Sequence, residues 1–269
     1  MPGDEINFAV KTEILFGIHP VYEALKAGRR IFYDLYITKD TTSRRLKRTI
    51  TLAEMKKIPV KKITPSKLKM LSGTDTTQRI GAKVSRYPLS EIIEIVNKIK
   101  NNAGNPFLLL LDNVVDPHNL GALIRTGTCA GIDAVIITRD RSAPPTPAVS
   151  KSSAGALEHV DLALVTNMVN TIRFLKQNGL WIIGMDQNAK RSAFETDLSC
   201  PVAIVIGGEE KGIRPLVKRQ CDYLVSIPLF GKVDSLNASV AGGVTMYEVF
   251  RQRNINAEGD VSMDWGYET

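Results

Sequence analysis

The sequence predicts an α/β protein in which a small N-terminal α/β domain precedes a larger domain with a parallel sheet and helices on both of its faces. Five continuous apolar runs predict the strands of the larger sheet, at 107–111, 134–138, 180–184, 202–206 and 224–228. Apolar residues that are continuous, rather than alternating with polar ones, are typical of strands covered on both faces. Helices are expected between these runs, around 119–130, 167–178, 212–220 and 237–253.

The smaller domain is predicted from shorter elements that precede residue 88. Gly17-Ile18-His19-Pro20 is typical of a turn that leads into a short amphipathic helix, and Gly28 is the expected C-cap of that helix. Strand-like and helical stretches then alternate. The strands are expected at 31–38, 60–63 and 82–85, and the helices at 43–57 and 65–71.

The domain boundary is expected within residues 89–105. An amphipathic helix at 89–100 is followed there by the breaker-rich stretch Asn101–Pro106. We therefore divide the chain into a first domain at 12–88, a linker at 89–105, a larger domain at 106–253 and a polar, acidic tail at 254–269.

The positive charge of the chain lies in its N-terminal part. The net charge is +7, with 20 Lys and Arg against 10 Asp and Glu in residues 1–104, and 15 against 18 in residues 105–269. A basic module joined to a near-neutral one suggests a polyanion-binding arm on a domain that carries chemistry. The alternative is a charged surface that only aids solubility.

Several classes of protein are disfavoured by the segment after the first strand of the larger domain. Residues 112–121 contain neither G-x-G-x-x-G nor a Walker lysine, so Rossmann dehydrogenases, P-loop NTPases and Rossmann-type methyltransferases fit poorly. Cys129, Cys200 and Cys221 are far apart and form neither a zinc spacing nor a disulfide framework, so we expect no metal and a reducing cytoplasm. No signal-peptide pattern and no membrane-spanning run is found.

Three separated segments come after predicted strands and could carry chemistry. In 116–125, Pro117 begins a turn, Asn119 can cap a helix and Arg125 lies about two turns further on. In 207–209, two glycines and Glu209 come directly after a buried strand, where glycine allows close backbone approach to a ligand. Taken alone, each of these segments is more typical of a helix cap or a turn than of a site.

The third segment is Ser235-Leu236-Asn237, which precedes a helix rich in small residues. Ser235 or Asn237 is expected to cap that helix. His118, in the first segment, could suggest a general base, but a turn histidine bonded to backbone is the favoured interpretation.

Together, the order and spacing of the three segments resemble the three motifs of the SpoU (TrmH) branch of the SPOUT RNA 2'-O-ribose methyltransferases, over about 107–253. Within that branch, the start at Gly17–Val21 and the basic first domain resemble the bacterial 23S rRNA (guanosine-2'-O-)-methyltransferase group. The first domain is similar to an L30e-like RNA-binding fold. Related domains often carry a His-Gln-Gly signature before the strand expected at 82–85, where this chain has Thr76-Thr77-Gln78-Arg79-Ile80-Gly81 without the histidine, and this departure leaves the RNA target open.

The resemblance implies transfer of a methyl group from S-adenosylmethionine to a ribose 2'-hydroxyl of rRNA, with a guanosine of 23S rRNA as the expected target. It also implies a deep trefoil knot in the larger domain, an exception to the rule against knots. The cofactor would lie bent in that knot. Its adenine would pack against Gly207, Ile227 and Leu236.

The family's remaining site positions correspond to Arg125, Asn119, Glu209, Ser235 and Asn237. Arg125 is implied to assist loss of the hydroxyl proton, as an electrostatic and positioning group, because a guanidinium stays protonated. Asn119 and Glu209 would orient Arg125 and the motif loops, and Ser235 and Asn237 would hold the loop and contact RNA or cofactor. A homodimer formed through the larger domain is also implied.

Two alternatives remain open at the level of sequence. The first is the same reaction on tRNA or on another rRNA site. The second is a non-catalytic RNA-binding factor of ribosome assembly, which would be expected to have lost some of the motif residues that this chain keeps.

Overall fold

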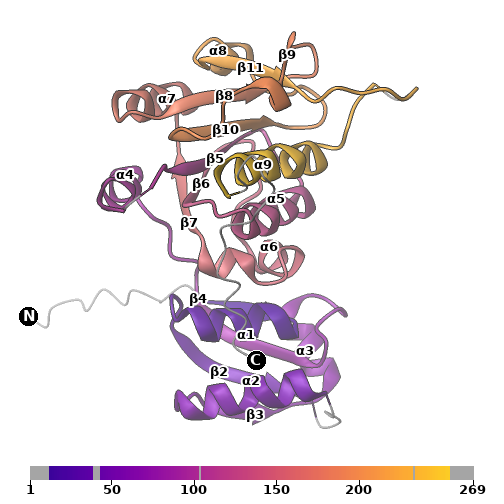
Figure 1. The fold of residues 1–269 in the computed structure, drawn as a ribbon. Coiled ribbons are helices and arrows are strands. Elements are labelled where there is room, and N and C mark those ends of the chain that lie inside the picture. Colours follow the sequence, from indigo (N-terminus) through magenta and orange to yellow (C-terminus); the bar gives the residue numbers. More distant parts are fainter. Residues whose placement is uncertain (1–11, 39–42, 103, 233, 255–269) are drawn as a thin grey trace, which may run out of the picture. The chain divides into compact units, whose positions relative to one another are not determined.

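The computed structural model describes residues 12–254 apart from 39–42, 103 and 233, and they form two compact units (Figure 1). The first unit contains residues 12–88 and Pro145–His159, and the second contains Leu89–Pro144 and the residues from Val160 onward. The chain therefore does not divide at one cut between 89 and 105. All but the first residue of the predicted tail at 254–269 lies outside the described residues.

The first unit is built on a four-stranded sheet in the order β1-β4-β2-β3. Its strands are β1 (Thr12–Phe16), β2 (Phe32–Ile37), β3 (Val60–Lys62) and β4 (Ile80–Ser85). β4 runs antiparallel to both β1 and β2, whereas β3 is parallel to β2. The helices are α1 (Ile18–Ala27), α2 (Arg44–Met55) and α3 (Pro65–Ser72). Gly28 is the predicted C-cap of α1, in the left-handed conformation that favours glycine.

A buried ion cluster holds residues 145–159 in the first unit. This segment forms α6 (Pro147–Ser152) and the 3-10 helix η1 (Ala156–His159). Arg30 is buried and donates to Glu158 through Nε (2.6 Å) and Nη2 (2.9 Å), and it also pairs with Glu13. Ser150 Oγ donates to the same Glu158 carboxylate at 2.8 Å. The sequence grouped this segment with the larger domain, but its partners lie in the first unit.

The second unit contains a seven-stranded, wholly parallel sheet in the order β7-β6-β5-β10-β8-β11-β9. The five predicted strands are present as β5 (Phe107–Asp112), β6 (Ala134–Thr138), β8 (Trp181–Met185), β10 (Val202–Gly207) and β11 (Tyr223–Ser226). Two strands were not predicted, β7 (Asp161–Val165) and the two-residue β9 (Arg191–Ser192).

Helices cover both faces of this sheet, as predicted. One face packs in a single apolar cluster with α4 (Ile92–Asn101), α7 (Met168–Gln177) and α8 (Pro215–Lys218). Leu108 and Leu110 of β5 point into that cluster, so the helix expected within the linker is part of the second unit. The other face carries α5 (Pro117–Cys129) and α9 (Ala238–Asn254), which lie side by side in Figure 1.

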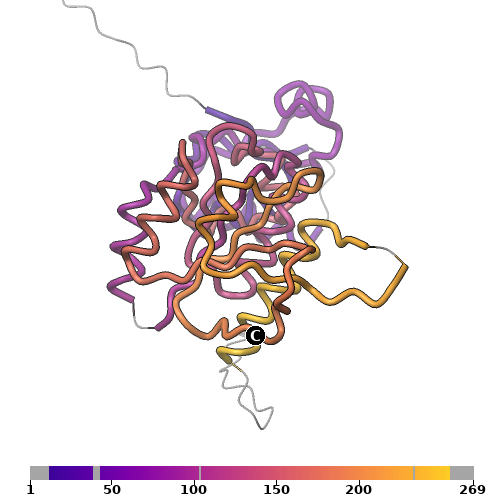
Figure 2. The backbone as a smooth tube through the Cα atoms, turned by 90° about the horizontal axis from the view of Figure 1, so that it is seen from above, coloured from indigo at the N-terminus to yellow at the C-terminus, as the bar shows by residue number. Residues whose placement is uncertain are grey.

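Small residues let α9 approach the sheet closely. A Cβ added at Gly242 would lie 2.4 Å from Leu123 Cδ2 of α5 and 2.6 Å from Ile206 Cδ1 of β10. The small-residue run predicted in this helix therefore serves packing within the chain. Figure 2 shows the segment between β11 and α9, on either side of residue 233, looping away from the sheet, and Phe230 within it is fully exposed. None of the helices in the described part of the chain is long and apolar enough to cross a membrane.

Candidate active site at the carboxyl ends of the strands

A cavity of about 500 Å³ opens at the carboxyl ends of β8, β10 and β11. Its walls are the segments directly after these three strands and the start of α9. This is the edge at which parallel α/β sheets bind their ligands. Six of the eight residues singled out in the sequence line it: Gly207, Glu209, Ile227, Ser235, Leu236 and Asn237.

The last residue of β10 and the first residue of the loop after it have no room for side chains. A Cβ on Gly207 would lie 2.0 Å from the carbonyl carbon of Gly212 and 2.1 Å from the nitrogen of Ile213. A Cβ on Gly208 would lie 2.2 Å from the carbonyl oxygen of Asn113. The sequence predicted close backbone approach to a ligand here, and what the structure shows is close approach of these glycines to the backbone of the same chain.

A buried carboxylate anchors the far end of the same loop. Asp112, at the end of β5, is fully buried and accepts hydrogen bonds from the backbone nitrogen and the Nε of Arg214, both at 2.9 Å. Nη2 of Arg214 lies 2.6 Å from the same carboxylate. Sequence reasoning missed this pair, although an aspartate that ends a wholly apolar strand is a signal for a buried partner.

Asn237 joins the three motif segments. Its Nδ2 donates to Asn119 Oδ1 at 3.2 Å and to Glu209 Oε1, so one amide group connects the start of α5 with the segments that follow β10 and β11. Its Oδ1 accepts from Ser239 Oγ (2.5 Å), Ser239 N (2.9 Å) and Val240 N (3.3 Å). Asn237, rather than Ser235, is therefore the side chain that caps α9.

The start of α5 differs from the prediction in one detail. The helix begins at Pro117, and Asp116 is its N-cap, with a side chain that accepts from the backbone nitrogen of His118 at 2.9 Å. Asn119 lies inside the first turn, is buried, and turns its side chain toward Asn237 instead.

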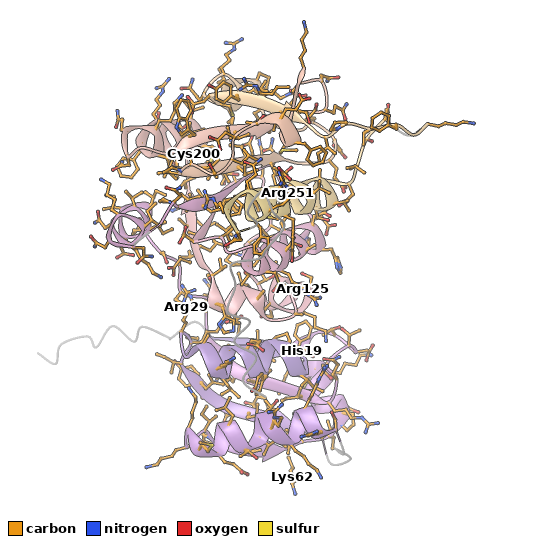
Figure 3. The ribbon with its side chains drawn as sticks, viewed as in Figure 1. His19, Arg29, Lys62, Arg125, Cys200 and Arg251 are labelled. Atoms are coloured by element: carbon orange, nitrogen blue, oxygen red, sulfur yellow. The ribbon has the colours of Figure 1, made fainter. Side chains whose placement is uncertain are left out.

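Arg125 stands apart from this junction within a single chain. It comes six residues after Asn119 on α5, which places it about 120° further around the helix axis. Its side chain is exposed (Figure 3), and it makes no hydrogen bond or ion pair with any residue that the structure describes. The structure thus brings Asn119, Glu209 and Asn237 together, leaves Ser235 exposed on the cavity wall, and keeps Arg125 on the outside of the unit.

An ion pair that the sequence analysis did not single out lies in the wall of the cavity. Asp186, directly after β8, accepts from Lys218 Nζ at 2.5 Å. Burial raises the pKa of Asp186, but the hydrogen bonds from Lys218 and from the backbone of Asn188, together with the charge of Lys218, lower this pKa below its ordinary value. The cavity therefore contains a carboxylate that stays ionised well into acidic solution.

A second cavity, of about 450 Å³, adjoins the first. The two share the wall formed by Gly208–Lys211 and Ala238, and Asn119 lines the second. Its remaining walls are residues 113–116, after β5, and Arg141, after β6. Two ligands could therefore bind on either side of Glu209, which is the geometry that a group transfer between them requires.

Residues 106–247 match the model of the SpoU rRNA methylase family, and residues 14–90 match a model described as RNA 2'-O ribose methyltransferase substrate binding. The chain belongs to the SpoU rRNA methylase family. This finding confirms the family that the three segments predicted. The first matched region contains all eight site residues that the sequence singled out, because these residues lie between Asn119 and Asn237.

Curated relatives and solved structures agree with this assignment. The chain is 38% identical to the 23S rRNA (guanosine-2'-O-)-methyltransferase RlmB of Ralstonia nicotianae, over 91% of this chain and 98% of that protein. It is 37% identical to the putative TrmH family tRNA/rRNA methyltransferase YacO of Bacillus subtilis, over 90% of this chain and 96% of that protein.

The structure of the SpoU methyltransferase AviRb from Streptomyces viridochromogenes, in complex with AdoMet, has a TM-score of 0.75 at 23% identity and covers 90% of both chains. A putative RNA methyltransferase of the TrmH family from Porphyromonas gingivalis has a TM-score of 0.71 at 27% identity, also over 90% of both chains. These matches confirm the predicted α/β fold with its N-terminal domain. The knot stays a prediction.

Proposed function

We propose that the chain transfers the methyl group of S-adenosylmethionine to a ribose 2'-hydroxyl of rRNA, at a guanosine of 23S rRNA. The observation that carries this proposal is the junction of Asn119, Glu209 and Asn237 between two adjoining cavities, in a member of the SpoU rRNA methylase family. The relative named as a 23S rRNA (guanosine-2'-O-)-methyltransferase supports the choice of target, since it matches nearly full length.

The first cavity suits S-adenosylmethionine in size and in chemistry. Its volume of about 500 Å³ lies within the range of small-molecule sites. Ile206, Ile227 and Leu236 provide aliphatic walls for a flat adenine, and the carboxylates of Asp186 and Glu209 suit the cationic end of the cofactor. When bound, the cofactor supplies an electrophilic methyl group on a sulfonium.

The residues of the junction act by holding the two ligands in line. Asn237 fixes the start of α9 through its cap and fixes Glu209 and Asn119 through its amide group, so the motif loops keep one arrangement. Ser235 is exposed on the same wall and is available to RNA or cofactor. Positioning of this kind can supply a large part of the rate of a bimolecular transfer.

We assign to Arg125 a role at the ribose hydroxyl group that is methylated. Its guanidinium stays protonated, so it does not act as a base by itself. Its positive charge would favour loss of the hydroxyl proton by stabilising the negative charge that develops on the ribose oxygen, and it would also hold a substrate phosphate. The exposure of its side chain leaves it accessible to RNA.

A homodimer packed through α9 is part of the proposal. One face of α9 presents Val240, which is 50% exposed, and Tyr247, which is 49% exposed, seven residues apart and therefore on one side of the helix. The opposite side packs into the chain. Arg125 lies on α5, which is adjacent to α9, and its exposed side chain is proposed to reach the partner.

The first unit is proposed to hold the RNA. Its region 14–90 matches a substrate-binding model, and α2 exposes the cations Arg44, Arg45, Lys47 and Arg48 on its surface. Cations of this kind contact phosphates and release counterions, which gives affinity without sequence preference. A cytoplasmic location belongs to the same proposal, because Cys129, Cys200 and Cys221 are free thiols and the substrate is ribosomal.

Labelled S-adenosylmethionine, incubated with the full chain and either unmodified 23S rRNA or bulk tRNA, tests the proposal. We expect label in 23S rRNA and little in tRNA. Label in tRNA alone would move the target to the tRNA class named for some relatives. RNA binding without any transfer would contradict the enzymatic proposal and favour a non-catalytic assembly factor.

A further inference from the structure

An ion pair lies in the wall of the first cavity, outside the part of the wall that this cavity shares with the second. Asp186 follows β8 and Lys218 ends α8, and Lys218 Nζ lies 2.5 Å from Asp186 Oδ2. Both residues line the first cavity and neither lines the second. The other charged residues of the first cavity, 209–211, belong to the shared wall. Among the described residues, Asp186 and Lys218 are therefore the charged groups that line the first cavity alone.

Both members of this pair keep part of their hydrogen-bonding capacity open. The carboxylate of Asp186 accepts from Lys218 through Oδ2 and from the backbone nitrogen of Asn188 through Oδ1, at 3.0 Å. A carboxylate can accept about four hydrogen bonds, so Asp186 can take further donors. The ammonium of Lys218 makes no other hydrogen bond or ion pair with the residues that the structure describes. The Lys218 side chain is 31% exposed and that of Asp186 is 11% exposed, so a ligand in the cavity can reach both.

The proposed cofactor has an amino-acid end that needs a partner of each sign. The sulfonium of S-adenosylmethionine carries the methyl group, the adenosyl part and a chain that ends in an ammonium and a carboxylate. With the nucleotide on the far side of the shared wall, the methyl group must point toward that wall, and adenine is placed against the aliphatic residues Ile227 and Leu236. The amino-acid end is then left with the charged groups that line the first cavity alone, Asp186 and Lys218.

The ion pair matches such a zwitterion in charge and in hydrogen bonding. Asp186 can accept from the ammonium and Lys218 can donate to the carboxylate, so each charge of the ligand meets its opposite. A lone cation or a lone carboxylate in the wall would attract one of these groups and repel the other. Since Asp186 and Lys218 are held 2.5 Å apart, they can meet two charges that the ligand carries on one carbon atom.

We propose that Asp186 and Lys218 bind the amino-acid end of S-adenosylmethionine, with Asp186 accepting from its ammonium and Lys218 donating to its carboxylate. The inference rests on the proposed function and deepens it, because it names the residues that distinguish the cofactor from adenosyl compounds without an amino-acid end. It also gives a role to the loop after β8, which contains none of the three motif segments.

The test measures the affinity of the full chain for adenosyl compounds by isothermal titration calorimetry. The compounds are S-adenosylmethionine, decarboxylated S-adenosylmethionine, which lacks the carboxylate, and S-methyl-5'-thioadenosine, which lacks the whole amino-acid end. With the wild-type chain we expect the decarboxylated compound to bind about 10- to 100-fold more weakly than S-adenosylmethionine, as the loss of a hydrogen bond between charged groups predicts. Equal affinity for these two compounds would overturn the inference, because no group would then recognise the carboxylate.

Two variants then remove the charges of the pair one at a time. Lys218→Met keeps the aliphatic stem and removes the ammonium, so it should bind S-adenosylmethionine and the decarboxylated compound within about 3-fold of each other. Asp186→Asn should bind both compounds about 10-fold more weakly than wild type, since both carry the ammonium, and should still prefer S-adenosylmethionine. The affinity for S-methyl-5'-thioadenosine should stay within about 2-fold of wild type in both variants, because this compound has no group for the pair.

Lys176→Met is the matched control. Lys176 Nζ pairs with Asp222 at 2.6 Å, and neither residue lines the two cavities. The side chains of this pair are 37% and 17% exposed, close to the values for Lys218 and Asp186. The control variant therefore loses a similar ion pair, and it should bind all of the compounds as wild type does.

Two results for the variants would overturn the inference. The first is an unchanged preference for S-adenosylmethionine over the decarboxylated compound in Lys218→Met. The second is an equal loss of affinity for all of the compounds, S-methyl-5'-thioadenosine included, which would mean that the pair only shapes the cavity. In either case the proposed function would stand, whereas a wild-type chain that binds no S-adenosylmethionine would contradict both.

Discussion

Substituting alanine for Gly207 should disturb the cofactor cavity, because the structure leaves no space for a methyl group there. In Gly207→Ala the added Cβ would begin 2.0 Å from the carbonyl carbon of Gly212, where ordinary contacts start at 3.4 Å. The neighbouring atoms are backbone, so residues 212–213 must move by about 1.4 Å to restore normal separation. Overpacking of this kind costs about 1–3 kcal/mol of unfolding free energy.

The displaced loop carries part of the cavity wall, including Glu209. A misplacement of about 1 Å at an active site can lower a rate about 100-fold. We therefore expect the affinity of Gly207→Ala for S-adenosylmethionine, measured by isothermal titration calorimetry, to fall at least about 10-fold, which is about 1.4 kcal/mol. Urea unfolding should show a loss of about 2 kcal/mol in stability.

Gly243→Ala in α9 is the matched control. A Cβ at that position would lie 3.5 Å from Thr126 Cγ2, which is ordinary contact, and alanine favours a helix interior by about 1 kcal/mol over glycine. This variant should keep wild-type cofactor affinity and unfold no more easily than wild type. Cofactor affinity within about 2-fold of wild type for Gly207→Ala would refute the reasoning about the loop after β10.

Three further predictions concern other parts of the molecule. Arg30→Met leaves the buried Glu158 without its cation and should lower the unfolding free energy by about 3–5 kcal/mol in urea titrations; a loss below about 1 kcal/mol would contradict the role of the ion cluster. Burial raises the pKa of Asp186, but the hydrogen bond and charge of Lys218 lower it below its ordinary value, so Asp186 should stabilise the fold fully above about pH 4. This stabilisation should be lost as the pH falls through the lowered pKa, and the difference in unfolding free energy between wild type and Asp186→Asn should then disappear. A difference that does not depend on pH would argue against the ion pair. RNA affinity should fall steeply with salt: the slope of the logarithm of the binding constant against the logarithm of the salt concentration should be roughly −0.7 to −0.9 per phosphate contact. Replacing the exposed cations of α2 by glutamine should make that slope less steep. An affinity that does not depend on salt would rule out an electrostatic RNA-binding arm.

The strands that the sequence predicted correctly are those whose burial leaves a continuous apolar run. β5 and β10 are buried at every position, and their apolar runs mark them plainly. β7 is as long as β6, but it was missed because it begins with Asp161, which leaves an apolar run of only four residues, 162–165. The position of the cavity could be predicted from the strands, because loops at the carboxyl ends of parallel strands gather at one edge.

What the sequence could not show depends on contacts between distant residues. Arg30 and Glu158 are 128 positions apart, and no local pattern indicates that the segment ending at His159 packs with the first unit. The N-cap of α5 was predicted at Asn119 instead of Asp116 for a local reason. Pro117 occupies the first helical position, where proline is favoured, and this signal points to Asp116 as the cap. Asn119 was then free for the bond to Asn237.

The most direct test of the proposed function is the chemical position of the transferred methyl group in 23S rRNA. RNA labelled by the full chain and S-adenosylmethionine would be hydrolysed in alkali, which cleaves next to free 2'-hydroxyls and leaves a 2'-O-methylated linkage intact. We predict that the label is recovered in an alkali-stable dinucleotide with guanosine at its 5' position, at a single site. Arg125→Ala should abolish this product while retaining cofactor affinity. Label recovered in mononucleotides, as expected for a methylated base, or undiminished transfer by Arg125→Ala, would contradict the proposal.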